Sequence, residues 1–219
     1  MFYRPDTEPH GLAFNPFKSC VVPRPIGWIV TLKPGGAANV APFSQFNIVG
    51  FDPGYVMFSA NAHPPDFKAK HSTEYAEMNG EFVYNMATAD LRQSVVDSSY
   101  LMDRDSDDIA TLGLTAAAGV AVKTPRIAQS PVAFECRYHT TLVLPGNSPD
   151  TTHRMVIGRV VGIYIDDKAL AEDGRLDVLR VKPLARLGYT DYSSIDSLFT
   201  VTPQGAGAAG IQRKMAGGA

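Results

Sequence analysis

The chain has few cysteines, no excess of charge of one sign and no long apolar run. Its 219 residues include two isolated cysteines, Cys20 and Cys136, which favours reduced thiols over a disulfide-stapled scaffold. The net charge is −2 without blocks of like charge, so neither a nucleic-acid partner nor an acidic membrane surface is indicated. No run approaches the roughly 18 apolar residues of a spanning helix, and the N-terminal MFYRPDTEPHG has no apolar signal core. We therefore expect a cytoplasmic protein that contacts neither nucleic acid nor membrane.

Sequence motifs of several enzyme classes are also missing. The five histidines show no HxH or HxxxH spacing, so no metal site is expected. There is no GxSxG elbow and no P-loop. A GxGxxG pattern occurs at 205–210, but too few residues follow it for the helix, strand and acid of a dinucleotide site. We assign it to a Gly/Ala-rich tail at 203–219, separate from a single domain at 1–202.

The patterns that are present are mostly those of β-strands. Ile26, Trp28, Val30 and Leu32 recur at a period of two, which predicts one apolar strand face before a turn at 33–36. Further strands are expected at 55–59, 81–87, 132–144 and 155–166, and helices at 72–79, 91–101 and 107–112. Many strands with few helices predict a mainly β barrel with peripheral helices, not βαβ units.

Pro42 lies in the second arm of the first hairpin. Proline has no N–H, so we expect this arm to pair incompletely and to leave backbone groups free beside small residues. Such an arm is a candidate cradle for a flat heterocycle. An ordinary hairpin with an irregular edge is the alternative.

A second group of residues has the chemistry of an anion site. Ser59 and Asn61 end a predicted strand, Lys70 follows a proline-containing loop, and Ser72 is expected to cap the next helix. Hydroxyls, an ammonium group and free backbone N–H groups together suit a phosphate. A capped surface helix with exposed lysines is the alternative.

The chain resembles the flavin reductase-like family of FMN-binding split barrels, which includes flavoredoxin-like proteins. The resemblance rests on six segments in order, RPIGWIVT, NVAPFSQFN, DPGYVMFSAN, KHSTEYAEMNGEFVYN, HRMVIGRVVGIYIDD and PLARLGYTDY, and covers most of residues 10–192. It implies an antiparallel Greek-key split β-barrel with peripheral helices. It also implies bound FMN, with FAD as the alternative, in a homodimer whose FMN lies near the interface.

The resemblance also implies site residues. It places around the cofactor Arg24, Pro25, Ile26, Thr31, Asn39, Ala41, Pro42, Phe43, Ser44, Asn47, Ser59, Asn61, Lys70, Ser72 and Arg186. The family usually has Lys-Asp-Thr where this chain has Lys70-His71-Ser72. His153 corresponds to the histidine of a family Gly-Asp-His, although Thr151 and Thr152 replace the glycine and the acid. We expect His153 either to contact a nicotinamide or substrate, or to be an ordinary strand-edge histidine.

The implied activity is that of a flavoprotein oxidoreductase. A flavin reductase would pass hydride or electrons from NAD(P)H through bound FMN to a flavin, an oxygenase partner or a small-molecule acceptor. The flavin carries the chemistry, so the protein orients the reactants and needs no catalytic side chain. The alternatives are an FMN electron carrier without its own nicotinamide site, and a non-enzymatic flavin-binding module.

Overall fold

The computed structural model describes residues 1–61, 71–100, 103, 105–148 and 151–201. Its largest sheet has seven antiparallel strands in the order β3-β2-β6-β9-β10-β5-β4. These strands are β2 (Gly27–Leu32), β3 (Ala38–Phe43), β4 (Phe46–Phe51), β5 (Gly54–Asn61), β6 (Glu81–Met86), β9 (Val132–Pro145) and β10 (Thr152–Ile165).

The two edge strands of this sheet follow one another in the chain. Only Ser44 and Gln45 separate β3 from β4, so the sheet must curl until its edges meet. A hydrogen bond of 2.8 Å from the backbone N of Ser59 to the carbonyl of Gln45 joins β5 to this link. The sequence prediction of a curved antiparallel barrel is confirmed.

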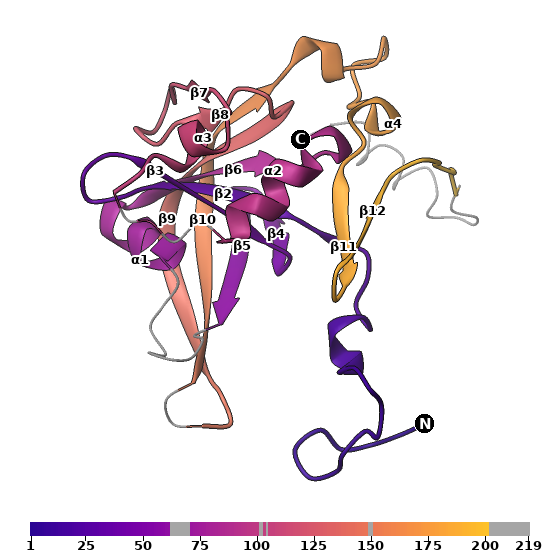
Figure 1. Cartoon of the computed structure of the whole chain (residues 1–219). Helices are drawn as coiled ribbons and strands as arrows, with labels where there is room; N and C mark the ends of the chain where they lie inside the picture. The colour runs from indigo at the N-terminus through magenta and orange to yellow at the C-terminus, as the bar shows by residue number, and fades with distance from the viewer. Residues whose placement is uncertain (62–70, 101–102, 104, 149–150, 202–219) are drawn as a thin grey trace.

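Smaller elements surround the barrel (Figure 1). β1 (Arg24–Pro25), β11 (Leu184–Gly188) and β12 (Asp191–Ser194) form a three-stranded sheet, and β7 (Ala116–Ala117) pairs with β8 (Arg126–Ile127). The α-helices are α1 (His71–Asn79), α2 (Arg92–Asp97), α3 (Asp108–Thr111) and α4 (Val178–Val181). The 3-10 helices are η1 (Pro16–Lys18), η2 (Ala89–Leu91), η3 (Ser98–Tyr100) and η4 (Asp167–Ala169). In Figure 1, α2 lies beside the large sheet on the side of β11 and β12.

Strand β2 lies at the centre of the core because both of its faces are buried. Trp28 and Val30 pack into one apolar cluster with Ile127, whereas Ile29 packs into a second cluster with Phe58. The predicted apolar face is confirmed for Ile26, Trp28 and Val30, and the other face is buried as well. The Trp28 indole N–H donates to the Ser98 hydroxyl at 2.9 Å, which satisfies a buried donor and ties α2 and η3 to the barrel.

The expectation that Pro42 interrupts pairing is wrong. β2 and β3 pair along their whole length, with Trp28 opposite Pro42. Backbone N–H groups on one strand point alternately toward its two sides. The N–H groups of Ala38 and Val40 point to the outer edge, where Asp107 and Asp108 accept them at 3.0 and 2.8 Å. Pro42 is two residues beyond Val40, so its backbone nitrogen also faces the outer edge. The N–H that proline lacks is therefore not one that would pair with β2.

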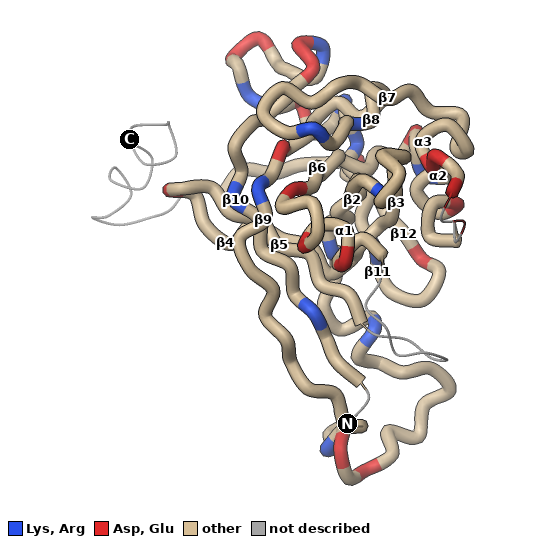
Figure 2. The backbone as a smooth tube through the Cα atoms, turned by 90° about the vertical axis from the view of Figure 1, so that its left-hand side faces the viewer, with Lys and Arg blue, Asp and Glu red and all other residues tan. Residues whose placement is uncertain are grey.

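The remaining observations concern charge, membranes and the tail. Basic and acidic positions are interspersed in Figure 2, with several acidic ones near α1, α2 and α3. Among the described residues, no helix is long and apolar enough to cross a membrane. The tail from residue 203 lies outside the described residues, so the division at 202 stays a prediction.

Candidate functional site

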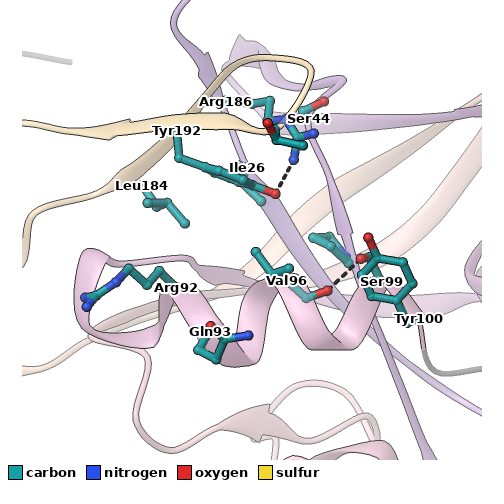
Figure 3. Close-up of a pocket in the computed structure, with 12 residues that line it drawn as sticks. Ile26, Ser44, Arg92, Gln93, Val96, Ser99, Tyr100, Leu184, Arg186 and Tyr192 are labelled. Carbon is teal, nitrogen blue, oxygen red and sulfur yellow. Dashed lines mark hydrogen bonds between the residues drawn. The ribbon is translucent and has the colours of Figure 1, made fainter.

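A pocket of about 540 Å³ lies between α2 with η3 and the sheet of β11 and β12 (Figure 3). This volume is within the roughly 300–1,000 Å³ of small-molecule sites. Its lining residues are Ile26, Pro42, Ser44, Arg92, Gln93, Val96, Ser99, Tyr100, Leu184, Arg186, Thr190 and Tyr192. Four of them, Ile26, Pro42, Ser44 and Arg186, are residues that the sequence placed around a cofactor.

Arg186 borders the pocket together with Tyr192. Its guanidinium lies 4.4 Å from the centre of the Tyr192 ring and donates to the Tyr192 hydroxyl. Across the β1–β11 ladder, Arg186 stands directly opposite Arg24. Neither arginine has a carboxylate partner among the described residues. Like charges that face each other across a ladder are destabilising, so an anion bound here would stabilise the pair.

Arg24 is held mainly by the chain that precedes it. Its Nη1 donates to the carbonyls of Lys18 and Val21 at 2.9 and 2.6 Å. Its Nε is buried and has no hydrogen-bond partner within the described part of the chain. Pro25 is exposed. The sequence expectation that Arg24 lies beside a ligand stays a prediction.

A buried polar cluster joins β2, β3 and the first turn of α1. The Asn39 amide donates to the hydroxyl of Thr31 at 3.1 Å and to that of Ser72 at 2.9 Å. All three side chains are buried. Helix α1 begins at His71, so Ser72 is inside the first turn and the expectation that it caps the helix is wrong. Its oxygen accepts a hydrogen bond from Asn39, and within the described part of the chain its own proton has no acceptor.

Thr73 adds an unsatisfied group to the same turn. The residue is fully buried, and its Oγ1 has no partner among the described residues. Buried hydroxyls are nearly always hydrogen-bonded, so one without a partner calls for an explanation. The first turn of a helix also presents free N–H groups and a positive dipole end. Lys70, which the sequence assigned to this site, lies outside the described residues.

A third group lies where β4, β5 and β10 face outward. Asn61 and His153 are cross-strand partners, and both are exposed; His153 Nδ1 lies 2.9 Å from Asn61 Oδ1. Asn47 is exposed as well, and its side chain accepts from the backbone of Ile48 at 2.8 Å. Ser59 is half-buried on β5, between the core residues Phe58 and Ala60.

The predicted site residues are therefore divided among three places in one chain. Side-chain alternation along β3 separates two of these places, because Asn39 and Ala41 project to one face of the strand and Pro42 to the other. Phe43 is a core residue that packs on Phe58, with ring centres 4.8 Å apart. Ala41 is half-buried beside it.

Sequence reasoning missed the pocket wall that α2 and η3 supply. Arg92, Gln93, Val96, Ser99 and Tyr100 line it. The segment was expected to be helical, but the letters LRQSVVDSSY match no ligand motif. The described residues contain no group of three or more His, Cys, Asp or Glu side chains placed to hold a metal ion.

Comparison with known proteins identifies the family. The sequence profile of the flavin reductase like domain matches residues 18–189. The chain belongs to this family. A protein of Bacillus subtilis (strain 168), YwrF, is 31% identical over 182 residues, which cover 83% of this chain and 88% of that protein.

Several solved structures share the fold of this chain. Nitrilotriacetate monooxygenase component B from Bacillus cereus has a TM-score of 0.83 at 21% identity, covering 92% of this chain and 98% of its own. A split-barrel-domain protein from Shewanella frigidimarina NCIMB 400 has a TM-score of 0.73 at 21% identity, with coverages of 86% and 90%. An FMN-binding protein from Thermus thermophilus has a TM-score of 0.70 at 16% identity, with coverages of 92% and 99%. The predicted split barrel is confirmed.

Proposed function

We propose that this member of the flavin reductase-like family binds FMN and acts as an oxidoreductase. Electrons from NAD(P)H would pass through the flavin to free flavin, an oxygenase partner or a small organic acceptor. The observation that carries the proposal is the first turn of α1, where the buried hydroxyls of Ser72 and Thr73 have no acceptor for their protons among the described residues. The FMN-binding and monooxygenase-component neighbours support the cofactor and the type of partner.

The residues present fit the phosphate of FMN. A hydroxyl is one donor and two acceptors, so Ser72 can accept from Asn39 and still donate to a phosphate oxygen. The Thr73 hydroxyl, which has no partner in the described part of the chain, would supply a second donor. The first turn of α1 favours a dianion by the positive end of the helix dipole and by the backbone N–H groups that a helix cannot pair internally at its start. Lys70 would add a cation from the segment just before this turn.

The flavin ring would pass the end of β3, where Pro42 and Ser44 form one wall of the pocket, on the opposite face of the strand from Asn39 and Ser72. Bound flavin supplies the hydride chemistry, accepting two electrons from a donor and returning them to an acceptor. The chain's own residues would hold the ring and keep water from it, with Ile26 and Leu184 as apolar surface. Arg186 would place positive charge near the ring, which favours the reduced, more negative flavin.

We also propose a homodimer with FMN near the interface. Exposed apolar side chains gather on β4 and β10, where Ile48, Val49 and Phe51 are 47%, 55% and 88% exposed and Ile163 is 63% exposed. Large apolar side chains exposed to this degree are typical of interaction sites. A second copy would cover it and bring Asn47, Asn61 and His153 of one protomer toward its partner.

Light scattering tests the dimer directly, because the expected mass is twice the 23.6 kDa of one chain. The Phe51→Asp and Ile163→Asp variants should shift that mass toward the monomer. A monomer in the unmodified protein would contradict this part of the proposal.

The position of His153 favours a second candidate, an FMN electron carrier without a nicotinamide site. Its imidazole lies 2.9 Å from Asn61 and does not line the pocket. Anaerobic stopped-flow mixing of FMN-loaded protein with NADH or NADPH separates the two functions. Rapid bleaching of the flavin supports the reductase, whereas no reduction by either nucleotide supports the carrier.

The absorption spectrum of the purified protein tests the proposal as a whole. A yellow protein that releases FMN, identified by mass, is the expected result, and released FAD would correct the cofactor. A colourless protein that takes up no FMN at micromolar concentration would refute flavin binding and leave a split barrel of other function. The cytoplasmic location stays a prediction, tested by cell fractionation.

A further inference from the structure

The pocket between α2 and β11 is more positive than the chain around it. Its twelve lining residues include two arginines, Arg92 and Arg186, and no aspartate or glutamate. The whole chain carries 22 acidic residues and a net charge of −2. Acidic positions also lie close to α2 in Figure 2. A concave site that gathers one sign of charge raises the local concentration of ligands of the opposite sign.

The two arginines differ in how many of their donors are used. Arg186 stacks on Tyr192 and donates to its hydroxyl. Arg92 donates once, from Nη1 to the carbonyl of Ala89 at 2.8 Å, and has no ion pair among the described residues. A guanidinium has five N–H donors in a planar fork that suits a carboxylate. Arg92 therefore retains most of its hydrogen-bonding capacity for a ligand.

The rest of the pocket is apolar or aromatic. Ile26 and Leu184 are buried, and Val96 faces them from α2. Figure 3 shows Tyr192 and Ile26 between the end of the pocket at Arg186 and Ser44 and the end at Arg92. Gln93 donates to Asp97 along the helix at 2.8 Å, so its amide is already engaged. Such a site buries a flat apolar body and fixes its charged end.

We propose that this pocket binds the second substrate of the flavin, and that this substrate is a small planar organic anion with a carboxylate held by Arg92. The proposal rests on the function proposed above, since the β3 wall of the same pocket would carry the flavin ring. Arg92 is assigned as a specificity-determining residue. The apolar residues Ile26, Val96 and Leu184 would contact the conjugated body, which places it against β3.

Calorimetric titration of the FMN-loaded protein with benzoate and with benzamide tests the assignment. The two probes have the same shape and differ in charge, so the ratio of their affinities measures recognition of the carboxylate. The unmodified protein should prefer benzoate, and Arg92→Gln should lower benzoate affinity about 10- to 150-fold while benzamide affinity stays the same. Arg92→Lys should keep part of the preference.

Arg175→Gln is the matched control, because it removes the same charge from an exposed arginine that pairs with Asp173 outside the pocket. It should leave both affinities unchanged. FMN affinity, measured separately by quenching of flavin fluorescence, should be the same in Arg92→Gln and in the unmodified protein.

Three results would overturn the inference. The first is equal affinity of the unmodified protein for benzoate and for benzamide. The second is a loss of benzoate affinity in Arg175→Gln as large as that in Arg92→Gln. The third is a loss of FMN affinity in Arg92→Gln as large as its loss of benzoate affinity. The last result would make the pocket the phosphate site. If no FMN binds at all, the proposed function fails by itself, and titration of the flavin-free chain still measures whether Arg92 selects a carboxylate.

Discussion

Replacement of Ser72 by alanine separates a phosphate contact from a purely structural hydroxyl. In the structure, Ser72 accepts from Asn39 at 2.9 Å and is 2% exposed. If its proton is donated to the phosphate of FMN, Ser72→Ala removes a hydrogen bond to a charged group. Such bonds contribute about 1.5–3 kcal/mol, so the dissociation constant of FMN should rise about 10- to 150-fold.

Riboflavin provides the comparison, because it has the same ring system without the phosphate. Its affinity should change little in Ser72→Ala. The variant also leaves one N–H of the Asn39 amide without its acceptor in a buried place, which costs about 1–3 kcal/mol of folding stability. This cost affects both ligands equally, provided that the variant remains folded at the assay temperature.

The assay titrates FMN and riboflavin into flavin-free protein and follows flavin fluorescence. Thr111→Ala is the control, since among the described residues the Thr111 hydroxyl on α3 bonds to the carbonyl of Asp107 alone, at 2.8 Å. It should leave both affinities unchanged. An equal loss for the two flavins in Ser72→Ala, or no loss for either, would refute the assignment of the phosphate to the first turn of α1.

Two further predictions concern buried groups outside the pocket. Lys33 and Asp108 form an ion pair of 2.8 Å with side chains only 3% exposed, so Asp108→Leu alone should lower the free energy of unfolding by about 3–5 kcal/mol. The double variant with Lys33→Met should recover the part of this loss that comes from the unpaired lysine, but not the part that comes from the Val40 N–H, which loses its acceptor in both variants. Urea denaturation measures both variants, and simple additivity of the two substitutions would contradict the reasoning. Burial raises the pKa of Cys136 in the folded chain, so above about pH 8.5 the unfolded chain loses this proton first, and stability should fall by about 1.4 kcal/mol per pH unit. In Cys136→Ala, the free energy of unfolding should no longer show this fall with rising pH. If the same fall remains in that variant, groups other than Cys136 cause it.

The sequence predicted most strands because their apolar alternation depends only on local chemistry. It did not predict that β2 would be buried on both faces, since Thr31 and the glycine at position 27 read as polar or neutral there. The effect of Pro42 was misjudged for a related reason. The missing N–H of a proline matters only if its nitrogen faces the paired strand. Which side it faces follows from the register of β2 with β3, in which Trp28 stands opposite Pro42, and the sequence alone does not give this register.

The candidate site was predictable only in part. Ile26, Pro42, Ser44 and Arg186, which the family resemblance placed around a cofactor, line one pocket, and their part in cofactor binding stays a prediction. The α2 wall was missed because its contribution comes from the tertiary packing of an ordinary helix. In the sequence, nothing distinguishes Arg92 from the other charged residues. It becomes a candidate ligand contact only because it lines the same pocket as Leu184 and Arg186.

The outer edge of β3 connects the two halves of this site. Asp107 and Asp108 accept the outward N–H groups of Ala38 and Val40, and Pro42 offers none, so no donor at these three positions is left to pair with another strand. Asp108 is itself held by Lys33, which also donates to two backbone carbonyls near α3. This network fixes the strand whose alternate residues reach Ser72 on one face and the pocket on the other. Weakening it should therefore loosen phosphate and ring contacts together, whereas a change at Ser72 or at Arg92 should affect only one of them.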